Sequence, residues 1–219
     1  MASKTKNADG TEQEDQGMFA IRKMSPWLFP IISVKMGPAF MDMILSTEEM
    51  QNLIKSNEKF DLILGEAFMQ ESVLGGFSAR FKAPIIGVAT FMPNLWSNFM
   101  VGNPAPAAYI PDPQLGFTNR MTFCERVMNF LYGLENEIAF TTFYMSAQDE
   151  IMRKYFGEDL PPLEDILKNT SLVLVNHHYS LAFPRPYLPN MIEIGGYHIN
   201  PPKPLPAVSF KNILRGKCY

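Results

Sequence analysis

The chain has 219 residues, of which 47% are hydrophobic, and a formal net charge of -3. This length and composition suit one domain with a substantial core. Because no basic block stands out, nucleic acid is not expected as a partner. Cys124 and Cys218 are the only cysteines, and two such residues make neither a disulfide framework nor a metal site.

The N-terminal segment is polar. Residues 1–17 contain no apolar stretch typical of a signal peptide, so we expect a disordered tail. The stretch from Trp27 to Leu45 is apolar but is interrupted by prolines, Lys35 and Asp42. We interpret it as a buried or surface-packed helix rather than a membrane span, which needs about 20 mostly apolar residues.

A strand, a helix and a second strand follow one another between residues 60 and 89. Apolar runs predict strands at Asp61–Leu64 and Ile85–Ala89, and the spacing between them predicts a helix over Glu71–Phe81. Such a unit implies parallel strands that are buried on both faces. Before it, Thr47 is the expected N-cap of a further helix.

The second half alternates in the same way. Residues 92–120 show no periodicity, whereas Met121–Phe156 predicts a long helix that breaks near Tyr132-Gly133. A short helix at Leu163–Leu167 and strands at Ser171–Val175 and Met191–Ile194 complete the pattern. Together these elements predict an α/β fold with a doubly wound parallel sheet.

Four segments resemble one family. They read FDLILGEAF (60–68), NFMVGNPAPAAYIPD (98–112), MTFCERVMNF (121–130) and VNHHYSLAFPRPYLPNMIEIGGYHINPPKPLP (175–206). Together they resemble the N-terminal, acceptor-binding half of the UDP-glycosyltransferases of animals, and of insects especially. The resemblance covers residues 18–206 and leaves a divergent C-terminal tail at 207–219.

The resemblance implies a Rossmann-like domain with helices flanking a parallel sheet, truncated at both ends relative to a full GT-B glycosyltransferase. It also implies transfer of a sugar from a UDP-sugar to a small lipophilic acceptor, with inversion. The donor would be bound by the other half, so we expect no cofactor in this chain. The expected alternative is a non-catalytic fragment that binds an acceptor or a partner, and an unrelated small-molecule carrier is a weaker third option.

Glu66 is the candidate catalytic residue that the resemblance implies. In the family an acid after this strand orients a histidine, and the histidine removes the proton of the acceptor hydroxyl. That histidine belongs to an earlier strand, and none of the three histidines here occupies its place. Taken without the resemblance, the interpretation of Glu66 as a helix cap or a solvent-exposed residue is preferred over a catalytic role.

The aromatic loop supplies the candidate acceptor site. Sites for lipophilic ligands are mostly apolar with a few polar groups. The alternative is that the loop merely packs onto the sheet. The candidates are Phe91, Met92, Trp96, Phe99 and Tyr109.

The remaining polar residues have weaker claims. His177, His178 and His198 are expected to be polar residues at strand ends rather than metal ligands, because no acid or cysteine stands at ligand spacing. Asn176 is expected to bind backbone in the turn after its strand. Asn169 begins a glycosylation sequon, which matters only in the endoplasmic reticulum lumen.

The family resemblance also implies detoxification and an endoplasmic reticulum membrane anchor. This chain shows no signal peptide or transmembrane span, so we expect it to be cytosolic if it is expressed as written. An oligomer with full-length relatives is a further expectation.

Overall fold

The structure is a computed structural model that describes residues 5–6, 12–13, 25–178, 180 and 183–200. Near the N-terminus, β1 (Thr5–Lys6) pairs with β2 (Glu12–Gln13) in antiparallel fashion. The rest of the tail at 1–17 and the tail at 207–219 lie outside the described residues. Their predicted disorder and divergence therefore stay predictions.

A four-stranded parallel sheet forms the centre of the domain. Its strands are β3 (Ile63–Glu66), β4 (Ile85–Ala89), β5 (Leu172–Val175) and β6 (Met191–Glu193), in the order β3-β4-β5-β6. The predicted parallel sheet is confirmed. The first strand begins two residues later than expected. The pairing of β3 with β4 begins at Ile63, which lies opposite Ile85. Pro84, which precedes β4, has no N–H with which to extend the hydrogen-bond ladder further.

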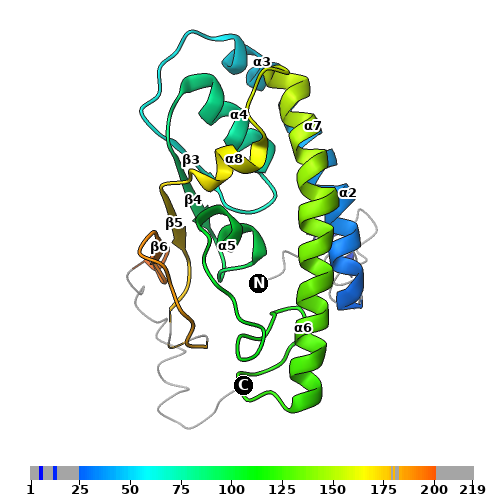
Figure 1. Cartoon of the computed structure of the whole chain (residues 1–219). Helices are drawn as coiled ribbons and strands as arrows, with labels where there is room; N and C mark the ends of the chain where they lie inside the picture. Colours follow the sequence, from blue (N-terminus) through cyan, green and yellow to red (C-terminus); the bar gives the residue numbers. More distant parts are fainter. Residues whose placement is uncertain (1–4, 7–11, 14–24, 179, 181–182, 201–219) are drawn as a thin grey trace.

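Helices cover one face of this sheet. They include α4 (Glu71–Phe81), α5 (Leu95–Val101) and α8 (Leu163–Lys168), and Figure 1 shows them beside the strands. Ile85 and Val173 are buried in a core that these helices share with the sheet. On the opposite face Leu64 is 62% exposed, so the expectation that both faces are buried is wrong for this strand.

The short helix α5 corrects the prediction that residues 92–120 have no regular structure. Asn94 accepts a hydrogen bond from the Ser97 backbone N–H, and the Ser97 hydroxyl accepts one from the Asn94 backbone N–H. This capping box stabilises a helix of seven residues that is too short to show a clear period.

A second correction concerns the long helix. Residues 123–156 run without a break through α6 (Phe123–Ile138), a π-helical segment η2 (Ala139–Tyr144) and α7 (Met145–Phe156). A glycine inside a helix costs only about 1 kcal/mol, so Gly133 does not end it. The irregularity lies instead at η2, where the Tyr144 ring occupies the space that a side chain on Gly37 would need.

Gly37 belongs to α2 (Phe29–Leu45), which follows a short 3-10 helix η1 (Pro26–Leu28) and packs against η2 and α7. The predicted helix is present and packs against the domain. The stretch Pro26–Leu45 is also long and apolar enough to cross a membrane, so the prediction that it is not a span stays a prediction. Next in the chain is α3 (Glu48–Lys55). Thr47 is its N-cap residue, but the Thr47 hydroxyl donates to Ile44 O and accepts no helix N–H.

Candidate functional site

A groove of about 980 Å³ lies next to the carboxyl ends of β3 and β4. Ligands of open parallel sheets bind at these strand ends. Phe68 follows β3, and Phe91, Met92 and Pro93 follow β4, so the sheet itself brings these side chains together. Other aromatic walls come from distant segments, namely Phe29 of α2 and Phe140 of η2.

Four of the five predicted acceptor residues line this groove. Phe91 is 39% exposed, and Met92 and Phe99 are half-buried. Trp96 also contributes to the wall but is only 3% exposed, because its ring packs edge-on against Phe68. Trp96 is therefore mainly a core residue.

The fifth residue lies elsewhere. Tyr109 does not line the groove, and its side chain is 46% exposed. It stands in a turn in which its backbone N–H donates to Pro106 O. The proline-rich stretch around it was predicted as one aromatic loop, but only part of that loop faces the groove.

Polar groups stand among the aromatic walls. Asp112 and Arg185 both line the groove, and the Arg185 Nη1 donates to Pro93 O over 3.0 Å. Burial raises the pKa of Asp112 above its ordinary range and lowers the pKa of Arg185. Both residues lie in the quoted family-like segments, but no local pattern indicates that segments so far apart meet in one groove.

Asn129 holds the loop that forms the rim of the groove. It is 2% exposed, and its Nδ2 donates to Ala107 O and Ile110 O, each over 2.8 Å. Its Oδ1 accepts the Asp112 backbone N–H at 2.8 Å. One α6 side chain thus pairs with three backbone groups of the loop. A segment without regular structure cannot satisfy such groups by its own backbone hydrogen bonds.

We expect Asn129→Ala to lower the free energy of unfolding by about 2–4 kcal/mol, because it leaves buried backbone groups without partners. Urea unfolding of the two proteins measures this. Asn119→Ala, at an exposed position outside this network, is the control. Equal stability of Asn129→Ala and the parent chain would mean that water replaces all three bonds.

A second asparagine joins the loop to the segment before β6. The Asn103 Nδ2 donates to Asn98 Oδ1 and to Pro186 O, and the Asn103 Oδ1 accepts the Leu188 backbone N–H. The two proline-rich family-like segments therefore lie side by side. This contact fixes the position of Arg185, next to Pro186, at the groove.

Glu66 is the last residue of β3 rather than the residue after it. Its Oε1 accepts hydrogen bonds from the Thr90 backbone N–H at 3.2 Å and from the Thr90 hydroxyl at 3.1 Å. It does not line the groove, although Phe68 and Phe91, which follow the same two strands, both do. The carboxylate lies at the carboxyl end of β3 and links this strand to Thr90, which follows β4.

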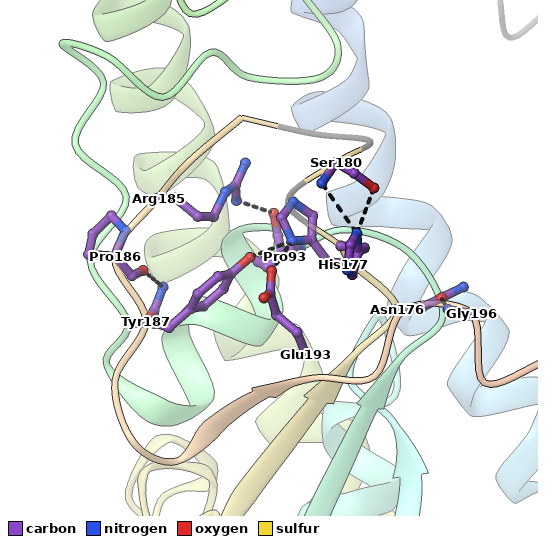
Figure 2. A network of polar contacts seen from close by, with 11 residues as sticks. Pro93, Asn176, His177, Ser180, Arg185, Pro186, Tyr187, Glu193 and Gly196 are labelled. Atoms are coloured by element: carbon purple, nitrogen blue, oxygen red, sulfur yellow. Dashed lines mark hydrogen bonds and ion pairs between the residues drawn. The ribbon is translucent and has the colours of Figure 1, made fainter.

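The buried His177 lies in a polar network, with Tyr187 and Glu193, that the sequence did not predict. Figure 2 shows its ring next to the ends of the Tyr187 and Glu193 side chains, and its Nδ1 lies 2.5 Å from Glu193 Oε1 and 2.8 Å from the Tyr187 hydroxyl. His177 is 5% exposed, and its Nε2 is buried without a hydrogen-bond partner. This imidazole is closed to solvent and joins β5 to β6.

The other polar residues behave as expected at strand ends. Asn176 binds backbone on both sides, because its Nδ2 donates to Thr90 O and its Oδ1 accepts the Gly196 N–H. His178 is exposed and contacts Ser180. Within the described part of the chain, no cluster of three or more His, Cys, Asp or Glu residues could hold a metal ion.

The family model described as "UDP-glucoronosyl and UDP-glucosyl transferase" matches residues 31–214. The chain belongs to this family. It is 32% identical to UDP-glucosyltransferase 2 of Dactylopius coccus over 176 residues, which is 79% of this chain and 33% of that protein. No solved structure matches the chain significantly.

Vertebrate relatives match as well. UDP-glucuronosyltransferase 2C1 of Oryctolagus cuniculus is 30% identical over 86% of this chain and 38% of its own length. The 2-hydroxyacylsphingosine 1-beta-galactosyltransferase of Mus musculus is 34% identical over 75% of this chain and 29% of its own length. The chain thus spans about a third of the length of these curated relatives.

Proposed function

We propose that this chain forms the acceptor-binding part of a UDP-sugar-dependent transferase and holds a small lipophilic acceptor in the groove. The observation that carries the proposal is the groove itself, with aromatic walls and a few polar groups at the carboxyl ends of parallel strands. Family membership supports it, and one relative is named for the transfer of galactose to a hydroxyacylsphingosine, a lipid.

Sugar transfer in this proposal follows the family mechanism. A histidine base removes the acceptor proton, the oxygen attacks the anomeric carbon, and UDP leaves with inversion. Glu66 is the acid that orients this base. In this proposal other parts of the enzyme bind the UDP-sugar and carry the base. The match of this chain to about a third of the relatives' length supports such a division. The second candidate is a non-catalytic protein that binds the same class of ligand.

Acceptor binding can be measured with 2-naphthol, a fluorescent lipophilic phenol. We expect the chain to bind it and the double variant Phe91→Ala/Met92→Ala to bind about tenfold or more weakly, because each truncation removes apolar contact area. The matched control is Phe143→Ala, since Phe143 is also exposed but lines a different cavity. Equal affinity of the double variant and the parent chain, or an equal loss in the control, would overturn the assignment of the groove.

A further inference from the structure

The helix α6 turns polar side chains toward the domain. Its buried residues are Asn129, Tyr132 and Asn136, whereas its large apolar residues Phe130 and Leu134 are 57% and 43% exposed. Asn129 and Asn136 are two helical turns apart, so both lie on the same side of the helix. Buried amides of this kind need an explanation, because their burial is costly unless they are hydrogen-bonded.

The hydrogen bonds of the two asparagines differ. The Asn129 amide forms three hydrogen bonds with backbone groups of the preceding loop. Asn136 is 8% exposed, and its side-chain amide forms no hydrogen bond with any residue that the structure describes. A buried amide without a partner lowers the stability of the folded chain. The fold therefore accounts for Asn129 and leaves Asn136 unexplained.

The amide of Asn136 opens into the candidate acceptor groove. Asn136 is one of the residues that line this groove, and neither of its amide atoms is enclosed by protein. The Tyr132 hydroxyl, about one turn earlier, is enclosed and has no hydrogen-bond partner within the described part of the chain. A ligand in the groove can therefore reach the Asn136 amide but not the Tyr132 hydroxyl.

Gly133 leaves room beside this amide. It lies three residues before Asn136 and four after Asn129, so it is on the same side of α6, and it also lines the groove. A Cβ atom at Gly133 would have no described atom within 4 Å apart from its own neighbours in the helix. Glycine is less favourable than alanine inside a helix. This glycine instead keeps open the space through which a ligand reaches Asn136.

The surroundings of Asn136 favour a neutral ligand group. An asparagine amide both donates and accepts hydrogen bonds, as do hydroxyl and amide groups of a ligand. Two acidic residues, Asp112 and Glu137, line the groove on the α6 side, which disfavours a negatively charged group there. Lys168 and Arg185 also line the groove, but both are already engaged with other protein groups.

We propose that Asn136 is a specificity-determining residue of the acceptor groove, whose amide binds a second, neutral polar group of the acceptor. This group is a hydroxyl or an amide and is distinct from the hydroxyl that receives the sugar. The inference rests on the proposed function and narrows its substrate class. The favoured acceptors carry two polar groups on an apolar body, because an analogue without the second group leaves the Asn136 amide unpaired.

A matched pair of fluorescent ligands tests this. 2,7-Dihydroxynaphthalene has the same apolar frame as 2-naphthol and one more hydroxyl. We expect the parent chain to bind it about tenfold more tightly than 2-naphthol. Asn136→Leu should bind the two compounds equally and keep the parent affinity for 2-naphthol. The control Asn119→Leu, at an exposed position outside the groove, should keep the parent preference.

Urea unfolding separates this role from a structural one. Replacing an unpaired amide by an apolar group removes no hydrogen bond, so Asn136→Leu should be at least as stable as the parent chain. A loss of stability like that expected for Asn129→Ala would show that Asn136 supports the fold and would overturn the proposal.

Two variants at Gly133 test access to the amide. Leucine and alanine both favour a helix more than glycine does, so neither change should unfold the chain. Gly133→Leu fills the open space and should weaken binding of 2,7-dihydroxynaphthalene about tenfold or more, whereas Gly133→Ala should have little effect. Equal affinity of the two variants would contradict an approach along Gly133.

The side-chain amide signal of Asn136 in a ¹⁵N spectrum gives a direct readout, and its absence in Asn136→Leu assigns it. It should shift when 2,7-dihydroxynaphthalene is added, while the Asn129 signal should stay in place. Equal affinity of the parent chain for the two compounds, or a preference that survives in Asn136→Leu, would overturn the inference and leave the proposed function standing. If neither compound binds, the proposed function is refuted and the inference falls with it.

Discussion

The unfolding free energy of this chain is expected to fall by about 3 kcal/mol as the pH rises from 4.5 to above 7, because of Glu71. This residue begins α4 and is 2% exposed. Burial raises its pKa from 4.5 to about 7, and the hydrogen bond from Tyr144 opposes this only in part. The Tyr144 hydroxyl donates to Glu71 Oε2 at 2.6 Å and accepts from Gln148 Nε2 at 2.9 Å.

The sign of the effect follows from proton binding. Between pH 4.5 and 7 the folded chain keeps a proton on Glu71 that the unfolded chain releases. The stabilisation is therefore complete below pH 4.5 and is lost as the pH rises through about 7. The interval between the two pKa values corresponds to about 3 kcal/mol.

Urea unfolding between pH 4.5 and 8 measures this, with Glu71→Gln as the test variant. A glutamine still accepts from Tyr144 but does not ionise, so the pH dependence should become flatter by the amount assigned to Glu71. Glu164→Gln, on an exposed helix surface beside Lys168, is the control and should keep the parent slope. Parallel pH profiles for the parent and Glu71→Gln would show that the buried carboxyl is not the cause.

Sugar transfer carries the second large effect. We expect the purified chain alone to form no glycoside from any UDP-sugar. A general base contributes roughly 10²–10⁴-fold, and the donor-binding part contributes orientation in addition. Product above the uncatalysed background, in a preparation free of other transferases, would contradict this expectation.

Glu66→Gln should then lower turnover roughly ten- to a thousandfold once the chain is joined to the remaining two-thirds of a full-length relative. A neutral amide no longer stabilises the protonated histidine that it orients. Acceptor affinity should change little, because Glu66 does not line the groove. Steady-state kinetics with one acceptor separates the two effects.

Thr90→Val is the matched control for Glu66. It removes the hydrogen bond from the Thr90 hydroxyl to Glu66 Oε1 and leaves the carboxylate in place. If Glu66 merely links two loops, both variants should have similar and small effects. If it orients a base, only Glu66→Gln should lower turnover strongly and change the pH profile.

Much of the fold was predictable because its signals are local. Apolar runs placed all four strands to within two residues, and helical spacing gave Glu71–Phe81 as observed. The start of β3 depended instead on Pro84 of its neighbour. The helix α6 continues through Gly133 because a glycine inside a helix costs only about 1 kcal/mol, which is too little to end it.

The site was predictable only in part, for the same reason. Phe91, Met92 and Phe99 come from one segment and were identified together. Arg185 reaches the groove through contacts with Pro93, 92 residues away, and Asn103 fixes the adjacent Pro186. The His177 network joins residues 10 and 16 positions apart across two strands. Such pairs arise from the register of the sheet and leave no periodic signal.

The most direct test of the central claim is a titration of the chain, labelled with ¹³C at its methionine methyl groups, with 2-naphthol. Met92 lines the acceptor groove, whereas Met36, Met43 and Met128 lie exposed on the outer helices. We predict that saturation shifts the Met92 methyl signal and leaves those three unchanged. Shifts confined to Met36, Met43 and Met128, with Met92 unmoved, would contradict an acceptor site at the sheet.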